Sequence, residues 1–314
     1  MIKFKHIVSL VLSFVWMPIC FALQPGNSAW VYSFKPSWVD HIKQVNASSQ
    51  ASNHFHYLFV NVGNVSVNSD HLLNIHYNHH RTQQLKKKLP NIHILANLSF
   101  WVKGTKFFKW SPAEYKKAAD KIAHLVNQDP YVSGAFLDLE IYKPCLLPFY
   151  KELKDKLNQK DKILAFIVRP GEETKHWFEQ TGSNSIAVLY GYDLHHPDDP
   201  SKPVSPKTYG KRLQKAVNHF VKTADQAKQH FMIGIPAIAT TYEWHCEEVM
   251  SGAVLKNPYP QIDYFKQARA VTQSIQSKYY LGNSVWALVA KTKHHIRSPL
   301  VISTQEWKLL SSSN

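Results

Sequence analysis

Residues 132–140 read VSGAFLDLE, an apolar run that ends in two acidic side chains. Similar runs recur along the chain, rich in Val, Ile, Leu, Phe and Tyr and without sustained polar alternation. Strands that are buried on both faces of a parallel sheet have this composition. The pattern therefore predicts eight strands, at residues 29–34, 57–62, 92–98, 132–139, 163–168, 186–192, 231–236 and 284–289.

Amphipathic segments separate several of these runs and predict helices, most clearly at residues 112–127, 149–158, 206–224 and 264–277. Ser111, Pro112 and Glu114 form a helix start signal, with Ser as N-cap and Glu at the third position. Eight strands that alternate with helices over about 290 residues favour the α/β class and a single-domain (β/α)8 TIM barrel. An open doubly wound sheet is the alternative, but the Gly-rich turn typical of that fold does not follow the first run.

The first 22 residues are predicted to be a cleaved signal peptide rather than part of the fold. Lys3 and Lys5 precede an apolar stretch at residues 7–19, and Cys20 to Ala22 provide small residues for cleavage. The stretch is shorter than the roughly 20 residues that span a bilayer. We therefore expect residues 23–314 to be an exported domain, secreted or periplasmic, without a transmembrane segment and monomeric.

The chain is basic, with 37 Lys and Arg against 22 Asp and Glu and a formal net charge of +15. Such a charge attracts acidic polymers. However, the basic residues are spread out, with residues 86–88 as the sole run, so a solvated basic surface is the preferred interpretation. No nucleic-acid-binding motif is present, and no nucleic-acid partner is expected. Beyond the signal peptide only Cys145 and Cys246 remain, so one disulfide or two free thiols are both open.

In a (β/α)8 barrel the functional groups lie at the carboxyl ends of the strands. Phe136, Asp138 and Glu140 point the same way, because side chains two apart share one face of a strand. If that face is the barrel interior, two carboxyl groups stand together at its mouth. Such proximity raises the pKa of one of them, as a general acid requires. The alternative is a solvated pair just beyond the strand.

Aromatic and polar residues mark the ends of other predicted strands. Tyr190 and Tyr192 share one face, Asp193 ends that strand, and Trp286 lies near the end of the last strand. Tyr32 is a further candidate at the end of the first strand. Aromatic rings with acids and a hydroxyl around them suit a sugar ring, although core packing is the preferred interpretation of each ring taken alone.

In this order the motifs resemble those of glycoside hydrolase family 18, the chitinases and endo-β-N-acetylglucosaminidases. The family ends its fourth strand in D-x-x-D-x-D-x-E, whose last two acids correspond to Asp138 and Glu140. Its M-x-Y-D is similar to residues 190–193, which read YGYD, and its G-I-P is similar to residues 234–236. Its strand-eight Trp corresponds to Trp286.

The resemblance covers residues 29–289 and includes two departures. Ser133 and Phe136 replace the first two Asp of the strand-four motif, and residues 97–101 lack the family's S-x-G-G. These departures favour an alternative function, that of a non-catalytic, lectin-like glycan-binding barrel.

The resemblance implies hydrolysis of β-linked, N-acetylglucosamine-containing oligo- or polysaccharides by substrate-assisted catalysis with retention. Glu140 would protonate the glycosidic oxygen, and Asp138 would hold the acetamido N–H of the substrate. Tyr192 would orient the acetamido oxygen, Asp193 would contact the sugar, and Trp286 would form the floor of the subsite. No metal or organic cofactor is implied.

Two other interpretations remain from the residues themselves. Glu243, beyond the seventh strand, is the candidate nucleophile of a conventional retaining glycosidase, and a lysozyme-like barrel is a related possibility. Histidines cluster at residues 76–80 and 195–196, but no Cys or carboxylate completes a metal ligand set at typical spacing, so no metal is expected. Residues 64–80 are interpreted as a loop over the second strand.

Overall fold

The computed structural model describes residues 23–32, 36–67, 73–102, 109–139, 143–170, 174–182, 184–192, 204–237, 259–288 and 303–312. The predicted signal peptide lies outside these residues. In the described part, a parallel sheet closes on itself, because β1 pairs with β9 on one side and with β2 on the other. The closed order is β1 (Asn27–Val31), β9 (Tyr280–Leu288), β8 (His230–Pro236), β7 (Ser185–Leu189), β6 (Ile163–Val168), β5 (Gly134–Asp138), β4 (His93–Val102) and β2 (Phe55–Val67).

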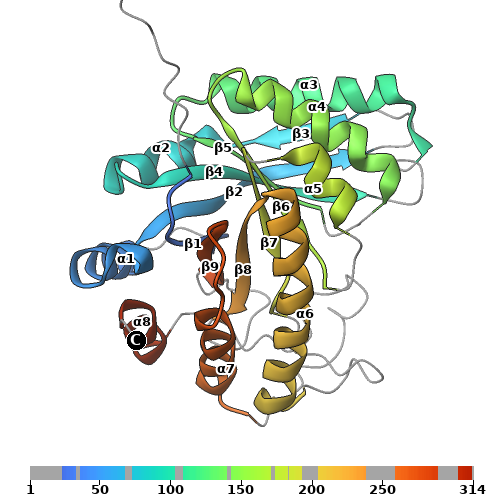
Figure 1. Cartoon of the computed structure of the whole chain (residues 1–314). Coiled ribbons are helices and arrows are strands. Elements are labelled where there is room, and N and C mark those ends of the chain that lie inside the picture. The colour runs from blue at the N-terminus through green and yellow to red at the C-terminus, as the bar shows by residue number, and fades with distance from the viewer. Residues whose placement is uncertain are drawn as a thin grey trace, which may run out of the picture.

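Helices surround this barrel, as the predicted (β/α)8 architecture requires (Figure 1). Figure 1 shows α3 and α4 side by side on one flank and α6 and α7 beside β8 on another. None of the described helices is long and apolar enough to cross a bilayer. The helices are α1 (Pro36–Ser48), α2 (His79–Lys88), α3 (Pro112–Gln128), α4 (Leu147–Asn158), α5 (Lys175–Thr181), α6 (Pro206–Ala227), α7 (Gln261–Gln273) and α8 (Thr304–Ser311).

The predicted start of α3 is confirmed atom by atom. The Ser111 hydroxyl accepts from the Glu114 backbone N–H at 3.4 Å, and the Glu114 carboxylate accepts from the Ser111 backbone N–H at 2.5 Å. This capping box pairs two backbone donors that a helix start otherwise leaves unpaired. The helix therefore begins where the sequence signal places it.

One prediction about the fold is wrong. Residues 64–67 and 73–77 are strands rather than parts of a loop, because β2 continues to Val67 and β3 (Leu73–Tyr77) returns along it as an antiparallel strand. The two strands pair from Gly63 with Tyr77 to Val67 with Leu73. Residues 73–77 read LNIHY, with alternating burial, which is the signature of a strand exposed on one face. A search for continuous apolar runs does not detect a strand of this kind.

Two apolar cores form because side chains alternate along each strand. One core lies between the strands and the helices, and the other fills the barrel. Inside the barrel, Phe59 and Phe136 stack with ring centroids 4.4 Å apart and planes within 4°. Trp30 packs edge-on against Phe136 at 4.6 Å. These fully buried rings block the barrel below its mouth, so the barrel interior is a packed core rather than a channel.

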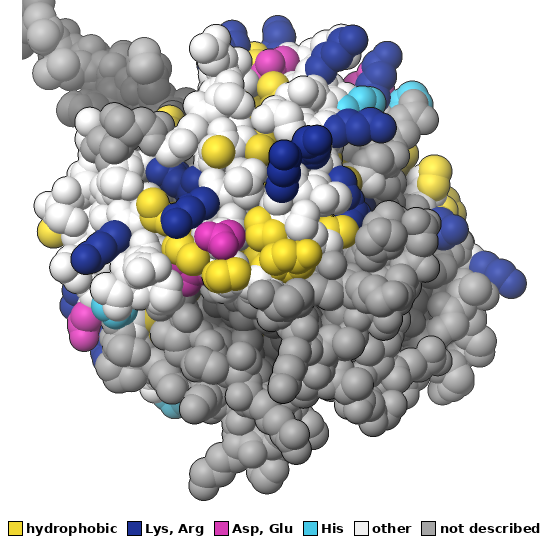
Figure 2. Space-filling view, turned by 90° about the horizontal axis from the view of Figure 1, so that it is seen from below, with side chains coloured by type: hydrophobic (Ala, Val, Ile, Leu, Met, Phe, Trp, Pro, Cys, Tyr) yellow, Lys and Arg dark blue, Asp and Glu magenta, His cyan; other side chains and the backbone are white. Residues whose placement is uncertain are grey.

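The expected basic surface is partly concentrated on α6. Lys207, Lys211, Lys215 and Lys222 lie exposed along its outward face, opposite the side that packs on the barrel. Figure 2 views the molecule from the end toward which β8 runs in Figure 1. On the described part of this face, Lys and Arg side chains predominate over acidic ones (Figure 2).

We predict that His93 makes the fold sensitive to acid. Its ring stacks on Tyr57 with centroids 5.6 Å apart. Burial lowers the pKa of His93, and nearby Lys86 and His56 lower it further. Below about pH 6.5 the unfolded chain therefore binds a proton that the folded state resists. Stability to urea should fall as the pH drops from 7 to 5.

The His93→Gln variant should show a smaller loss of stability over the same pH range. Some dependence should remain, because burial also lowers the pKa of His56. His124→Gln, at an exposed position on α3, is the matched control and should behave as wild type. An unchanged slope of unfolding free energy against pH in His93→Gln would contradict the assignment.

Candidate active site

The carboxylate of Asp138 lies at the inner rim of the barrel. Leu137 and Leu139 belong to the outer core, whereas Phe136 belongs to the interior core, so Asp138, two residues further on, faces inward. Its Oδ2 accepts a hydrogen bond from the Tyr32 hydroxyl at 3.3 Å. Two candidate residues that are 106 positions apart thus meet at the carboxyl ends of β1 and β5. Glu140 and Asp193 lie outside the described residues.

Three predicted aromatic residues form one continuous stack next to this rim. Tyr192 lies parallel to Trp286, with ring centroids 4.6 Å apart and planes within 3°. Tyr190 packs against Tyr192 with ring centroids 4.0 Å apart and the ring planes tilted by 36°. Trp286 is 6% exposed, so its indole is largely covered within the protein. The stack is therefore a rigid wall that is already packed on the Tyr192 side of the indole.

Backbone close approach explains why a glycine separates the two tyrosines. A Cβ on Gly191 would lie 2.2 Å from the carbonyl oxygen of Gly234 on the neighbouring strand β8. Tyr209 of α6 also donates its hydroxyl hydrogen to the Gly191 carbonyl oxygen at 2.5 Å. The chain beyond β7 is thus held against β8 and α6, and this contact positions Tyr192 against Trp286.

The structure adds two polar residues to the site, both from residues 97–101, where the family's S-x-G-G motif is missing. Asn97 and Ser99 lie on the interior side of β4, in register with Phe136 and Asp138 of β5. Asn97 is fully buried, and its amide makes no hydrogen bond with any described residue. Ser99 accepts a hydrogen bond from the Asn61 amide at 3.2 Å. Their sequence signal was polar residues at alternate positions in an otherwise apolar strand.

Together these groups form a polar rim on an aromatic base. An acid and a phenol face the interior at the carboxyl ends of β1 and β5, and a buried amide lies below them on β4, level with Phe136. The arrangement supplies hydrogen-bonding groups above apolar ring surfaces, as polyol ligands require. Acid–base chemistry at this rim would use the carboxyl group of Asp138 and that of Glu140, the next acid in the sequence.

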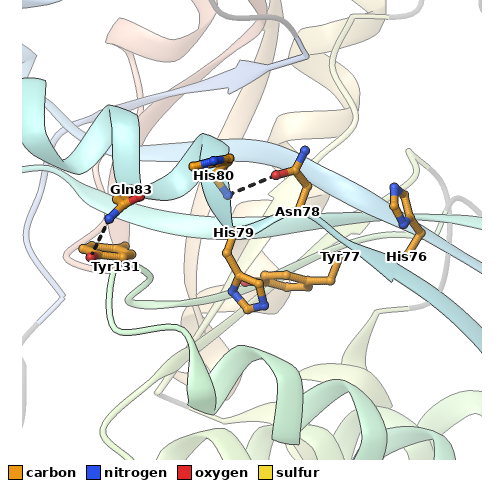
Figure 3. Close-up of a pocket in the computed structure, with 7 residues that line it drawn as sticks. All are labelled: His76, Tyr77, Asn78, His79, His80, Gln83 and Tyr131. Carbon is orange, nitrogen blue, oxygen red and sulfur yellow. Dashed lines mark hydrogen bonds between the residues drawn. The ribbon is translucent and has the colours of Figure 1, made fainter.

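The histidines at residues 76–80 gather on the outside of the barrel, away from this rim. With Tyr77, Asn78, Gln83 and Tyr131, the side chains of His76, His79 and His80 line a pocket of about 420 Å³ (Figure 3). Within the described ranges, no three His, Cys, Asp or Glu side chains are placed to hold a metal ion. His195 and His196 lie outside those ranges.

The remaining candidates from the sequence are Glu243 and the two cysteines. Glu243 and Cys246 lie outside the described residues. Cys145 is an exposed free cysteine just before α4.

Comparison with known proteins identifies the fold as a chitinase-like (β/α)8 barrel. No protein-family model matches the chain, and no curated protein does. The class V chitinase from Pseudomonas fluorescens Pf-5 aligns with TM-score 0.57 and 13% identity, over 91% of this chain and 98% of that one. The spore cortex-lytic enzyme SleL from Bacillus megaterium QM B1551 aligns with TM-score 0.56 and 12% identity, over 91% and 73%.

A chitinase from Bacteroides thetaiotaomicron aligns with TM-score 0.53 and 13% identity, over 84% of this chain and 89% of that one. Identities this low establish a shared fold, and the chemistry must be argued from this chain's own residues.

We predict that Asn97→Leu stabilises the protein. The substitution replaces a buried amide that lacks a described partner by an apolar side chain of similar size. Burying an unpaired amide costs on the order of 1–3 kcal/mol, so the free energy of unfolding should rise by about 1 kcal/mol. Urea denaturation measures the change.

Asn97→Ala is the control, because it removes the amide but leaves a cavity and should be less stable than Asn97→Leu. A loss of stability in Asn97→Leu would show that the amide is paired in the folded protein.

Proposed function

We propose that this protein is a glycoside hydrolase that cleaves β-linked glycans containing N-acetylglucosamine. The observation that carries the proposal is the Asp138 carboxylate, held inside the barrel rim by the Tyr32 hydroxyl. Its position matches the second-last acid of the family 18 motif, and the catalytic acid of that motif would be Glu140. The chitinase-like fold and the aromatic stack of Tyr192 and Trp286 support the same function.

In the proposed reaction, Glu140 donates a proton to the glycosidic oxygen. The acetamido carbonyl oxygen of the substrate attacks the anomeric carbon as the glycosidic bond breaks, which gives an oxazolinium ion and a free hydroxyl on the departing sugar. Water then attacks the same carbon while Glu140 takes up its proton. Two displacements at one carbon retain the configuration, and no metal or organic cofactor takes part.

Asp138 and Tyr32 would control the acetamido group. The Asp138 carboxylate accepts the acetamido N–H and balances the positive charge of the oxazolinium ion. The Tyr32 hydroxyl donates to Oδ2 of that carboxylate and fixes its orientation. Phe136, where the family has an acid, stacks on Phe59 and cannot supply a hydrogen bond. Tyr32 would therefore contribute to the orientation of Asp138 in this protein.

The chain's own chemistry defines a substrate class rather than one glycan. Aromatic rings beside hydrogen-bonding groups suit N-acetylated sugars, whose C–H faces pack on rings. The neighbours of known structure include chitinases and a spore cortex-lytic enzyme. Chitin-like oligomers, peptidoglycan and N-glycans all contain the required β-linked N-acetylglucosamine.

We predict that Glu140→Gln abolishes hydrolysis of a fluorogenic N-acetylchitooligosaccharide between pH 4 and 8. Loss of a general acid lowers the rate by about 10²- to 10⁴-fold. Glu243→Gln should retain activity, because the proposed chemistry uses no enzyme nucleophile. Activity lost in Glu243→Gln and retained in Glu140→Gln would instead indicate a conventional retaining glycosidase.

We predict that Tyr32→Phe lowers kcat roughly 5- to 10-fold, because the hydrogen bond to Asp138 is long, at 3.3 Å, and should contribute about 1 kcal/mol. KM should change little, since the hydroxyl holds Asp138 rather than the sugar. Tyr259→Phe, at an exposed tyrosine, is the matched control. Equal kinetics in Tyr32→Phe and wild type would remove Tyr32 from the site.

A non-catalytic glycan-binding barrel is the second candidate. The observation that favours it is Phe136, which is fully buried in the aromatic core where the family has an acid. Saturable binding of N-acetylchitooligosaccharides by the wild-type protein, without product after long incubation, would support this function over hydrolysis.

A further inference from the structure

A second concave site lies on the outside of the barrel, between the end of β3, the start of α2 and the segment before β5 (Figure 3). Its volume is about 420 Å³, and it is wide open to solvent, because His76, Asn78, His79 and His80 among its lining residues are exposed. Tyr131 lines it and precedes β5, whereas Asp138 ends β5. The five residues of β5, roughly 15 Å of extended chain, thus separate this pocket from the barrel rim.

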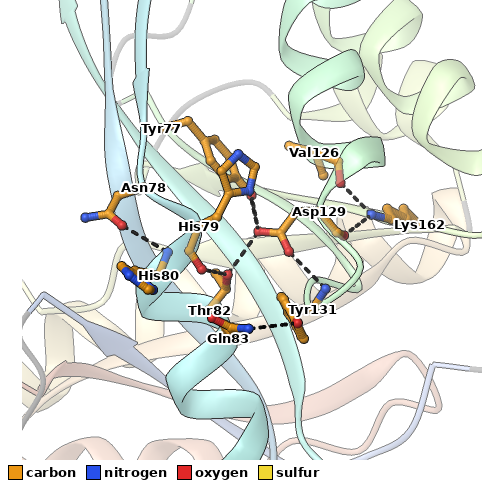
Figure 4. A network of polar contacts seen from close by, with 10 residues as sticks. All are labelled: Tyr77, Asn78, His79, His80, Thr82, Gln83, Val126, Asp129, Tyr131 and Lys162. Carbon is orange, nitrogen blue, oxygen red and sulfur yellow. Dashed lines mark hydrogen bonds and ion pairs between the residues drawn. The ribbon is translucent and has the colours of Figure 1, made fainter.

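A buried carboxylate holds the wall of this pocket in place (Figure 4). Asp129 has no exposed surface, and its Oδ2 accepts from the Tyr77 hydroxyl at 3.1 Å and the Thr82 hydroxyl at 3.0 Å. The same oxygen lies 3.3 Å from His79 Nδ1, and Oδ1 accepts from the Tyr131 backbone N–H at 2.9 Å. One group therefore ties β3, α2 and the segment before β5 together.

A further hydrogen bond holds Tyr131, which forms the opposite wall of the pocket. The Gln83 amide donates to the Tyr131 hydroxyl at 3.0 Å, which links the first turns of α2 to that ring (Figure 4). The Tyr77 and His79 rings pack with centroids 4.5 Å apart. The pocket is thus formed before any ligand arrives, and preorganisation of this kind lowers the entropic cost of binding.

The lining residues define the chemistry of a ligand. None of the seven is Lys, Arg, Asp or Glu, and the Asp129 carboxylate behind them is fully buried and already bonded. The described lining residues therefore carry no fixed charge to hold a phosphate, a carboxylate or an ammonium group. Phenol and imidazole rings supply apolar faces, while Asn78 and Gln83 add amide groups. Rings beside amides suit a neutral sugar, whose C–H face packs on a ring while its hydroxyls bond to polar groups.

We propose that this pocket is an accessory binding site for a neutral, N-acetylated sugar unit, separate from the catalytic rim. The inference rests on the proposed function in one respect, that the ligand belongs to the same class of glycan. A second contact on a polymeric substrate raises the effective concentration of chain near the rim. The accessory site should therefore affect polymers more than short oligomers.

The three histidines provide a direct test by NMR. Their ring-proton signals, assigned with His76→Gln, His79→Gln and His80→Gln, would be followed while tri-N-acetylchitotriose is added to the full mature chain carrying Glu140→Gln. We expect saturable shifts of these signals at millimolar sugar. Tyr131→Ala should weaken the binding that they report by about tenfold or more, and His80→Ala should also weaken it. Tyr259→Ala is the matched control at an exposed tyrosine outside the pocket and should leave the shifts unchanged.

Hydrolysis assays separate this proposal from the proposed function. In a background with Glu140 intact, Tyr131→Ala should lower the rate on insoluble chitin severalfold and leave the rate on the soluble trimer unchanged. Wild-type hydrolysis without histidine shifts would overturn the accessory site and leave the catalytic proposal standing. Tyr131-dependent shifts in a protein without hydrolase activity would support the accessory site and overturn the catalytic proposal. Shifts unaltered by both Tyr131→Ala and His80→Ala would overturn the accessory site even if binding occurs elsewhere.

Discussion

Closure of the sheet by the pairing of β1 with β2 is the constraint on which the candidate site depends. An open sheet would leave β1 and β5 on distant parts of one surface. Closure instead turns every second side chain of each strand inward, so that Tyr32 and Asp138 meet across the interior. The aromatic layer of Trp30, Phe59 and Phe136 fills the space below them.

Closure of the barrel also explains why position 136 carries an apolar ring. Its ring lies between Phe59 and Trp30 with no exposed surface, so a charge at this position would be buried among aromatic rings. Polar groups instead come from neighbouring strands, with the Tyr32 hydroxyl at the end of β1 and the Asn97 amide on β4. The candidate site is thus built differently from the motif it resembles, although the carboxylate of Asp138 occupies the corresponding place.

Much of the fold could be predicted because barrel strands are buried on both faces and leave continuous apolar runs. The run at residues 163–168 matches β6 at both ends, and the Ser111 capping box fixes the start of α3. β3 was missed because one of its faces is exposed, so its apolar residues alternate with polar ones. Asp138 could be identified as a site candidate because an acid at the end of an apolar strand is unusual. Asn97 stands out in the sequence only as a polar residue in an apolar run, because its burial depends on the side chains of three strands.

The sequence by itself determined the class of fold, the order of the eight barrel strands, and the face that Asp138 shares with Phe136, since these depend on local periodicity and strand alternation. Only the tertiary structure decided which residues touch. The hydrogen bond of Tyr32 to Asp138, the stacking of Tyr192 on Trp286 and the hydrogen bonds of Tyr77 and Thr82 to Asp129 all join segments that are far apart in the chain. Such contacts follow from barrel closure and helix packing, which no local pattern specifies.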